Sequence, residues 1–457
     1  MILKTKLYGK VYEFRDVKDV LAKASELKSG DRLAGIAAET TLERIAAKEV
    51  LSELTVKDIR ENPVIPYEND SVTRLIQDDL DEEAYIKIAN KTIAQMREWI
   101  LIHTTTSDML MKASGGMTSE VIAAISKIMG NLDLVYAGNK IKVMTTCNTT
   151  IGEDGVLASR LQPNHPVDDI TGIAAATYEG LSYGIGDAVL GVNPAIDTEE
   201  NTREVWNVLG EIRDKYAIPT QTCVLSHVTT QMKVLRSGLA KADLCFQSIA
   251  GSQKACEAFG ITTDLLEEAN ALFHDRGSAK GENVMYFETG QGSELSSSAH
   301  NGSDQQTLEC RCYGLARHYH PFLVNTVVGF IGPEYVYDTK QLLRAGLEDV
   351  FCGHMHGLPM GCDACYTNHM PVDQNDNETL LMLLGMTGCH YVMGLSQADD
   401  IMLMYQSTGF HDVAAVRELL KKEPIKEFKE WLEQMGIWSE GKLTAKAGDP
   451  TIFFKKK

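Results

Sequence analysis

The sequence predicts an α/β protein whose main unit is a (β/α)8 TIM barrel, with a mainly helical N-terminal extension and a short helical C-terminal tail. Eight short apolar runs each end in a polar residue or a turn, and eight is the strand number of such a barrel. Stretches with helical periodicity lie between most of these runs, so strand and helix alternate. The predicted strands lie at residues 156–164, 188–193, 223–227, 244–248, 284–288, 323–330, 358–363 and 391–395.

The N-terminal extension differs in pattern from the rest of the chain. Residues 3–14 are typical of a β-hairpin that turns at Gly9-Lys10. The stretch from Thr40 to Glu43 has the spacing of a capping box that opens a helix, and helical patterns dominate from there to about residue 103. We therefore predict three parts, which are the extension, the barrel and the tail, at residues 1–145, 146–410 and 411–457.

The spacing of apolar residues predicts two of the helices that connect the strands. After the second predicted strand, Thr198 leads into apolar residues that recur every three or four positions until Pro219 ends the segment. After the seventh strand, a similar segment runs from Asn377 to Gly388. The tail carries further apolar residues at helical spacing, which we expect to pack on the barrel or on a neighbouring chain: Val416, Leu419, Leu420, Phe428, Trp431 and Leu432.

Polar side chains lie at the carboxyl ends of the predicted strands. In a (β/α)8 barrel, this end of the sheet carries the chemistry. Arg160 and Gln162 are two positions apart, so the period of a strand places both on one face. A set of two carboxylates, one guanidinium and three amides suits a small, polar, cationic ligand. The set comprises Arg160, Gln162, Asn193, Gln247, Glu288 and Asp363.

Each of these residues also has a purely structural interpretation. Arg160 could pair with Glu288 or Asp363 and so neutralise the barrel mouth, and Asn193 or Gln247 could cap a helix. The set as a whole favours a ligand, because several unlike polar groups buried together leave many hydrogen bonds to satisfy.

The composition excludes several classes of function. The chain has 44 Lys and Arg against 63 Asp and Glu, a formal charge of −19 that disfavours nucleic acid as a partner. No stretch approaches the roughly 18 apolar residues of a membrane span, and residues 1–7 lack the apolar core of a signal peptide. We therefore expect a cytoplasmic protein. Its cysteines should be buried thiols, particularly those in apolar runs: Cys147, Cys223, Cys245 and Cys389.

A metal site is the main alternative. Cys362 and Cys365 have zinc-ligand spacing, and His354, His356 and His369 are close in sequence. The pattern lacks a second matched pair of ligands, which favours a structural origin and no metal. A metal-dependent barrel hydrolase would use these histidines together with Asp363 and a metal-bound water.

Longer motifs resemble one family. The segments at 1–14, 19–24, 74–79, 159–164, 286–293, 325–335 and 360–369 resemble the large, catalytic subunit of ethanolamine ammonia-lyase, and the similarity extends to residue 450. The resemblance implies an adenosylcobalamin-dependent radical lyase that converts ethanolamine to acetaldehyde and ammonia. It also implies a small partner subunit, association between large subunits, and packaging in a bacterial microcompartment as a family expectation.

The resemblance also assigns roles to single residues. It implies that Gln162, Glu288 and Asp363 hold the ammonium group of the substrate. It implies that Arg160, Asn193 and Glu288 hold the hydroxyl group. Arg160, Glu288 and Asp363 are the residues expected to act in catalysis. Further residues are expected against the cobalamin or lining the pocket: Pro194, Gln247, Ser296 and Met402 for the cofactor, and Val327 and Phe330 for the pocket.

Overall fold

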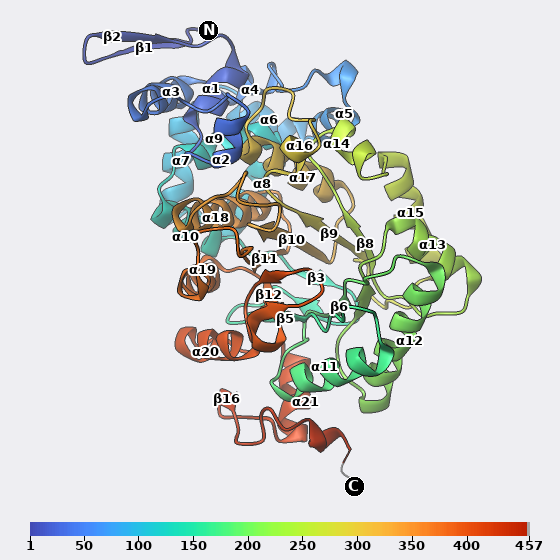
Figure 1. The fold of residues 1–457 in the computed structure, drawn as a ribbon. Coiled ribbons are helices and arrows are strands. Elements are labelled where there is room, and N and C mark those ends of the chain that lie inside the picture. The colour runs from blue at the N-terminus through green and yellow to red at the C-terminus, as the bar shows by residue number, and fades with distance from the viewer. Residues whose placement is uncertain (455–457) are drawn as a thin grey trace.

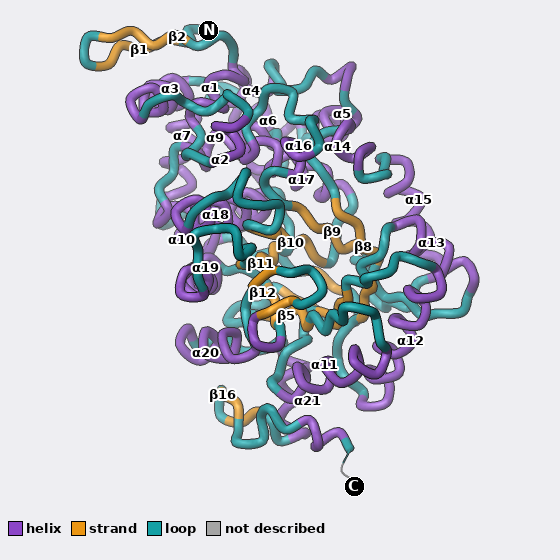
Figure 2. Tube along the Cα trace, viewed as in Figure 1, coloured by secondary structure: helices purple, strands orange, loops and turns teal. Residues whose placement is uncertain are grey.

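The computed structural model describes residues 1–454 and contains a parallel eight-stranded barrel. The strand order is β7-β6-β5-β12-β11-β10-β9-β8, and β7 and β8 lie side by side where the ring closes. Figure 2 shows the strands gathered at the centre with helices outside them. The strands are β5 (Ala158–Leu161), β6 (Val189–Val192), β7 (Thr222–Val224), β8 (Cys245–Ser248), β9 (Met285–Thr289), β10 (Leu323–Val328), β11 (Met360–Ala364) and β12 (Tyr391–Gly394).

All eight predicted strands are present, and the (β/α)8 fold class is confirmed. Their side chains are buried almost throughout, as expected for a parallel sheet that is covered by helices. The helices around the barrel are α11 (Ile170–Ser182), α12 (Glu199–Tyr216), α13 (Val228–Ser237), α14 (Gln253–Ala258), α15 (Thr263–Arg276), α16 (Ser293–Ser296), α17 (Gln305–His318), α18 (Thr339–Met355), α19 (Gln374–Thr387) and α20 (Phe410–Leu420).

Helix α12 begins after Thr198, whose side chain accepts a hydrogen bond from the amide of Asn201, as its predicted N-cap should. Helix α19 begins three residues before the predicted Asn377. Its N-cap is Asp373, which forms a capping box with Asp376, and Gly388 ends the helix as predicted.

The N-terminal extension lies at the top in Figure 1. After the hairpin of β1 (Lys4–Leu7) and β2 (Lys10–Glu13) it is almost wholly helical. Its helices are α1 (Val17–Ala24), α2 (Ser29–Leu33), α3 (Thr41–Glu53), α4 (Val56–Arg60), α5 (Ser71–Asp78), α6 (Glu82–Ile88), α7 (Ile93–Leu101), α8 (Ser107–Ser114), α9 (Ser119–Lys127) and α10 (Asn131–Lys140). The short strands β3 (Thr145–Thr146) and β4 (Thr150–Ile151) then lead into the barrel.

Two details of the extension differ from the sequence predictions. The hairpin turns at Tyr8-Gly9, one residue earlier than predicted, and both residues have positive φ, which a two-residue turn between twisted strands requires. Thr40 is the N-cap of α3, but the Glu43 carboxylate accepts the amide of Glu39 rather than that of Thr40. The capping box is therefore only half formed.

Buried ion pairs join the extension to the barrel helices. Lys28 Nζ lies 2.7 Å from Glu348 Oε2 of α18, and both side chains are fully buried. Lys127 Nζ lies 2.6 Å from Asp304 Oδ1, which precedes α17. Arg311 of α17 donates to carboxylates on the N-terminal side, including that of Asp70. Such pairs are strongly unfavourable to break, so they fix how the extension sits on α17 and α18.

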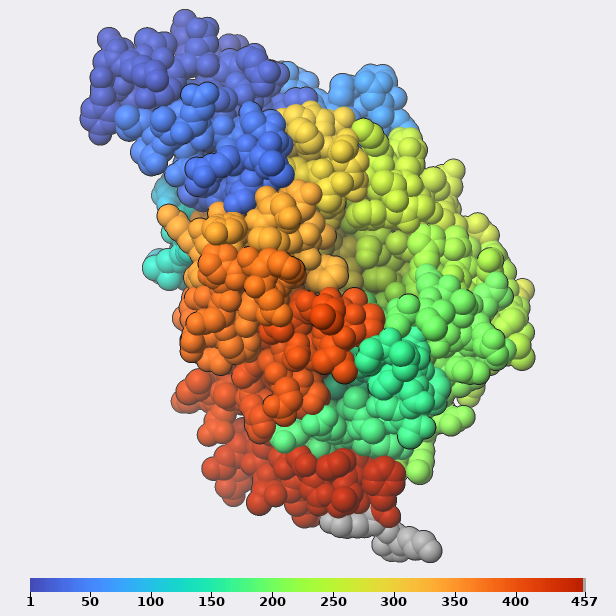
Figure 3. All heavy atoms as spheres, viewed as in Figure 1, coloured from blue at the N-terminus to red at the C-terminus, as the bar shows by residue number. Residues whose placement is uncertain are grey.

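The C-terminal tail closes the opposite end of the molecule, where Figure 3 shows it in red. It contains α21 (Lys426–Met435), β15 (Trp438–Ser439), β16 (Lys442–Leu443) and a 3-10 turn at Pro450–Phe453. The predicted apolar residues Val416, Phe428, Trp431 and Leu432 are buried, but Leu419 is largely exposed. Leu419 therefore does not pack on the barrel, and its packing on a neighbouring chain stays a prediction.

Candidate active site

Side chains from strands on opposite sides of the barrel meet near its C-terminal end. Arg160 comes from β5 and Glu288 from β9, which stand four places apart in the eight-membered ring. Asp363 comes from β11, and Asn193 follows β6. Because all the strands are parallel, their carboxyl ends face the same side, and the predicted residues converge there.

Arg160 is the centre of the cluster and is fully buried. Its Nη1 donates to the Tyr286 hydroxyl at 2.8 Å and to Glu288 Oε1 at 2.9 Å, and its Nη2 donates to Asn193 Oδ1. Burial opposes its charge, but Tyr286 and Glu288 raise the pKa of Arg160 above its usual value. Gly191 makes room for it, because a Cβ there would lie 3.0 Å from Arg160 Nε.

Glu288 presents one oxygen to the protein. Oε1 accepts from Arg160, from the Tyr286 hydroxyl at 3.4 Å and from Asn325 Nδ2 at 3.3 Å. No described residue donates to Oε2. The second oxygen is thus available to a ligand, while the first is held by the barrel.

Asp363 is buried, and its carboxylate accepts hydrogen bonds from two hydroxyl groups. Tyr405 donates to Oδ2 at 2.7 Å, and Ser407 donates to Oδ1. Burial raises the pKa of Asp363 to about 6, and the two hydroxyls and Arg160 oppose that rise. The carboxyl group is therefore mainly ionised at neutral pH.

The orientation of the Gln162 amide follows from its partners. Gln162 Nε2 donates to Asp400 Oδ2 at 2.6 Å and to the Tyr405 hydroxyl at 2.9 Å. A carboxylate can only accept, so the NH2 group faces Asp400. The acceptor atom Oε1 is left for the site.

The Asn193 amide is fixed in the opposite sense. Its Oδ1 accepts from Arg160, which can only donate, and from Asn164 Nδ2 at 3.4 Å. The donor atom Nδ2 is left for the site. One side of the cluster thus offers an acceptor and the other offers a donor.

The charge of the cluster is negative. Three carboxylates, those of Glu288, Asp363 and Asp400, face one guanidinium, that of Arg160. Together with the two fixed amides, this arrangement suits a small molecule with a cationic group next to a hydroxyl group. It can polarise an oxygen atom through Arg160 and hold a cation through the carboxylates.

The residues predicted to contact a cofactor all lie on segments at this end of the barrel. Pro194 is half-buried after β6, Ser296 is exposed at the end of α16, and Met402 is half-buried after β12. Gln247 is buried in β8, and both ends of its amide are already used. Its Oε1 accepts the amide of Val228 at the start of α13, and its Nε2 donates to the carbonyl of Ser248. The helix-capping role considered for Gln247 is therefore present.

Of the predicted pocket residues, Val327 is half-buried and Phe330 is partly exposed. The Phe330 ring packs edge-on against Tyr405, with 5.3 Å between ring centroids. Phe330 thus lies next to the hydroxyl group that donates to Asp363.

Large apolar side chains are exposed around the same end. All lie on loops that follow barrel strands, so they stand beside the charged cluster. Met404 is 73% exposed and Val167 is 68% exposed. The others are Ile196, Phe330, Tyr337 and Ile401. Apolar surface on several loops of one face is typical of a binding surface.

The residues of the alternative metal site do not come together. His354 contacts His390, with 3.2 Å between ring nitrogens, whereas His356 contacts Ser119 and His369 is exposed. Within residues 1–454, no group of three His, Cys, Asp or Glu side chains is arranged to hold a metal ion. All ten cysteines lie in this part of the chain, and each is buried as a free thiol. The prediction of buried thiols is confirmed.

Several residues of the cluster escaped the sequence predictions. Tyr286 lies two positions before Glu288 on β9, so the period of the strand could have identified it. Asn325 of β10 could have been found in the same way. Asp400, Tyr405 and Ser407 come from a segment without a regular apolar pattern. Only the folded chain places them beside Gln162 and Asp363.

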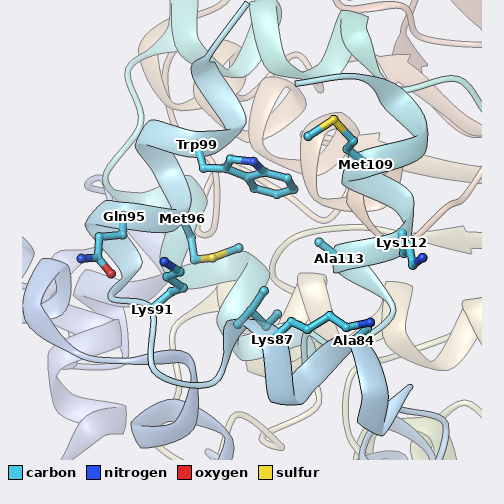
Figure 4. Close-up of a pocket in the computed structure, with 10 residues that line it drawn as sticks. Ala84, Lys87, Lys91, Gln95, Met96, Trp99, Met109, Lys112 and Ala113 are labelled. Atoms are coloured by element: carbon cyan, nitrogen blue, oxygen red, sulfur yellow. The ribbon is translucent and has the colours of Figure 1, made fainter. Parts of the chain in front are cut away.

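An apolar groove elsewhere is distinct from this cluster. It has a volume of about 480 Å3 and is lined only by α6, α7, α8 and the loops that adjoin them. Figure 4 shows Trp99 and Met109 on its walls, with Lys87, Lys91 and Lys112 around it. None of the cluster residues contributes to its lining.

Within the described residues, no helix has the length and apolar character needed to cross a membrane.

Comparison with known proteins gives consistent matches. Residues 12–446 match the family described as ethanolamine ammonia lyase large subunit (EutB). The ethanolamine ammonia-lyase large subunit of Escherichia coli (strain K12) is 56% identical over 454 residues, which cover 99% of this chain and 100% of that protein. Its counterpart in Salmonella typhimurium (strain LT2) is 57% identical over the same coverage. A crystal structure of phospho-2-dehydro-3-deoxyheptonate aldolase from Thermotoga maritima has a TM-score of 0.34 at 12% identity. It covers 64% of this chain and 75% of that chain, a likeness too weak to bear on the fold.

Proposed function

Because the chain belongs to the family of ethanolamine ammonia-lyase large subunits, we propose that it is the catalytic subunit of an adenosylcobalamin-dependent enzyme that converts ethanolamine to acetaldehyde and ammonia. One observation carries this proposal. The two amides of the cluster are fixed in opposite senses, with an acceptor at Gln162 and a donor at Asn193. Ethanolamine has an ammonium group at one end and a hydroxyl group at the other, which matches this polarity.

The ammonium group would bind on the acceptor side. Gln162 Oε1, Glu288 Oε2 and the Asp363 carboxylate are acceptors there, and two of the three groups are charged. Each carboxylate oxygen can accept more than one hydrogen bond. Asp363 can therefore accept a bond from the ammonium group in addition to those from the Tyr405 and Ser407 hydroxyls. Charge-assisted bonds of this kind are about twice as strong as neutral ones.

The hydroxyl group would bind on the donor side. Asn193 Nδ2 would donate to its oxygen, and Glu288 would accept its proton. Arg160 is held close by Glu288 and Tyr286, and its guanidinium would face the same oxygen. When that oxygen gains negative character, the buried cation stabilises it without reorganising.

The residues at the barrel mouth fit the proposed cofactor. A corrin ring is large and flat, with an apolar body and polar amide edges, and the loops around the cluster expose large apolar side chains among polar ones. We propose that Pro194, Gln247, Ser296 and Met402 would hold it, with Val327 and Phe330 lining the space next to the substrate. When bound, adenosylcobalamin supplies a carbon radical by homolysis of its cobalt–carbon bond. Gln247 would contribute through its position, because its amide already caps α13.

The same apolar surface supports the proposed partner. Ile401 and Met404 extend from the segment after β12, and both are largely exposed. A small subunit that covers this face would bury them and would close the site above the cofactor. We therefore propose that this chain alone has little activity.

The test is a reconstitution. The purified chain is mixed with ethanolamine and adenosylcobalamin, with and without the small subunit, and acetaldehyde is measured by its reduction with alcohol dehydrogenase and NADH. We expect acetaldehyde only when all components are present, and none with hydroxocobalamin in place of adenosylcobalamin. Turnover without any cobalamin would contradict the proposal. Activity that a chelator abolishes would favour the metal-dependent hydrolase.

A further inference from the structure

Residues 395–409, here termed the mouth segment, come directly after β12 and have an unusual backbone. Gln397, Ala398 and Met404 all have φ between 56° and 61°. Residues other than glycine rarely adopt this backbone conformation, and each such residue costs on the order of 1 kcal/mol. Three such residues persist in one segment only because surrounding contacts hold the segment in place.

The mouth segment is fixed by its own hydrogen bonds. A short hairpin pairs β13 (Asp399–Asp400) with β14 (Tyr405–Gln406), and Asp400 Oδ1 accepts the amides of Met402 and Leu403 at 2.9 and 2.7 Å. One carboxylate oxygen of Asp400 thus holds the loop. The other, Oδ2, points to the barrel.

Asp400 Oδ2 contacts two amides of the candidate site. It accepts from Gln162 Nε2 at 2.6 Å and from Asn164 Nδ2 at 2.7 Å. Asn164 in turn accepts the backbone amide of Asn193 through Oδ1 at 2.7 Å. Asp400 is 2% exposed, and its Oδ2 is covered by these two amides. Any effect of Asp400 on a ligand would therefore pass through the amides.

Tyr405 links Gln162 to Asp363. Its hydroxyl accepts from Gln162 Nε2 at 2.9 Å and donates to Asp363 Oδ2 at 2.7 Å. Burial raises the pKa of Tyr405 well above its usual value, so the hydroxyl keeps its proton. The Tyr405 proton therefore points to Asp363, and the hydroxyl lone pair faces Gln162.

From this arrangement we propose that Asp400 and Tyr405 are positioning residues that hold the Gln162 carbonyl oxygen toward the substrate, so that this subsite selects an ammonium group. The inference rests on the proposed function of the same site. If the Gln162 amide were free to rotate, its NH2 group could face the ligand instead. Only acceptors face the ammonium position when Asp400 is a carboxylate.

The test compares ethanolamine with ethylene glycol, a neutral molecule of similar size in which a hydroxyl replaces the ammonium. A hydroxyl group can donate or accept, so it does not depend on the Gln162 orientation. Ligand-observed NMR titration of the two-subunit protein without adenosylcobalamin gives a Kd for each ligand independently of turnover. The quantity of interest is the ratio of the two Kd values.

We expect Asp400→Asn to raise the Kd of ethanolamine at least tenfold and the Kd of ethylene glycol less than threefold. The matched control is Asp399→Asn on the same short strand, where the aspartate is exposed and contacts Gln406. The control should leave both Kd values within twofold of the wild type. An equal loss for both ligands in Asp400→Asn would reduce Asp400 to a structural role and overturn the inference.

A reciprocal exchange provides a second arm. In Gln162→Glu, two carboxylates would face each other, so ethanolamine should bind poorly. In the double variant Gln162→Glu/Asp400→Asn, the new amide at 400 can donate to the new carboxylate. We expect the double variant to bind ethanolamine at least threefold more tightly than Gln162→Glu. No recovery would contradict the orientation mechanism.

Tyr405→Phe removes the hydroxyl but keeps the ring against Phe330. Asp363 then loses one hydrogen-bond donor. The other titratable or polar groups that face it are unchanged: Ser407 of the mouth segment, Arg160 of β5, Glu288 of β9, and Cys362 and Cys365 of its own segment. The pKa of Asp363 should rise, and the acid limb of the kcat/KM profile should move to higher pH. An unmoved limb would contradict the role of Tyr405.

The two levels of proposal can fail separately. If the wild-type enzyme makes acetaldehyde from ethanolamine but Asp400→Asn keeps the wild-type Kd ratio, only the positioning inference falls. If the wild-type protein neither binds nor converts ethanolamine, the proposed function falls and the inference falls with it.

Discussion

The guanidinium of Arg160 and the carboxylate of Glu288 form an ion pair across the full width of the barrel, with Nη1 2.9 Å from Oε1. Their strands, β5 and β9, are as far apart in the ring as two strands can be. The pair neutralises the only guanidinium of the described cluster, so the charge of Asp363 is left without a cationic partner in the cluster. In the proposed site, Arg160 and Glu288 would face the substrate oxygen, and Glu288 and Asp363 would accept from the ammonium group.

Glu288→Gln should lower kcat/KM by at least about 100-fold, because hydrogen bonds to charged groups contribute about 1.5–3 kcal/mol each and Glu288 is proposed to hold two substrate groups. The fold should persist, since the amide oxygen of the substituted side chain can still accept from Arg160. Steady-state kinetics of the two-subunit enzyme and circular dichroism check both points. Glu200→Gln on the exposed side of α12 is the control and should have no effect. A near-normal rate in Glu288→Gln would show that the substrate is not held at both ends.

Arg160→Lys should reduce kcat more than it weakens ethanolamine binding. Lysine cannot reach Tyr286, Glu288 and Asn193 together, and the oxygen that Arg160 is proposed to hold would gain charge only as the reaction proceeds. Each 1.4 kcal/mol lost corresponds to roughly a tenfold fall in rate. The measurement is kcat and KM at saturating cofactor, with Arg236→Lys in an exposed ion pair as control. A raised KM with unchanged kcat would make Arg160 a ground-state anchor only.

Gly191→Ala tests whether the position of the Arg160 side chain matters. The added Cβ would lie 3.0 Å from Arg160 Nε and 3.4 Å from Leu225 Cδ1, so the guanidinium must move by a few tenths of an ångström. We expect kcat/KM to fall about tenfold, since small misplacements of a reacting group are costly. Gly210→Ala is the control, because its Cβ would meet nothing within 4 Å. If both variants are fully active, the close approach at Gly191 has no catalytic importance.

The pH profile should report the ionisation of Asp363. Burial raises the pKa of this carboxyl to about 6, and only its ionised form would offer charge to the proposed ammonium group. As the pH falls through about 6, Asp363 gains a proton, so kcat/KM should decrease on the acid side. In Ser407→Ala one donor to the carboxylate is lost, and the acid limb should shift to higher pH. A profile that is flat down to about pH 5 would be inconsistent with this assignment.

The sequence predicted the barrel well for a physical reason. A strand buried on both faces needs a short, continuous apolar run whatever its neighbours are, so all eight strands were visible without knowledge of the fold. The convergence of Arg160, Glu288 and Asp363 also followed, because parallel strands direct their carboxyl ends to one side. The predicted domain limits and the cofactor contacts stay predictions.

The parts that could not be predicted depend on long-range contacts. Nothing in the sequence of the mouth segment indicates that Gln397, Ala398 and Met404 adopt positive φ, and this backbone alone brings Asp400 to Gln162. Gln247 could serve either a ligand or a helix end, and only the folded chain shows its bond to the Val228 amide. Likewise, only the folded chain shows that the Glu43 carboxylate accepts the amide of Glu39, which leaves the capping box at Thr40 half formed.

The ion pair between Lys28 and Glu348 joins residues that are 320 positions apart in the chain. During synthesis on the ribosome, Lys28 emerges long before α18 exists, so the extension cannot complete its packing until most of the barrel has been made. Its helices meanwhile expose the apolar faces that they later bury against α17 and α18. Nascent chains that stall before residue 348 should therefore be bound by chaperones and digested by proteases at the N-terminal end, although that end was made first.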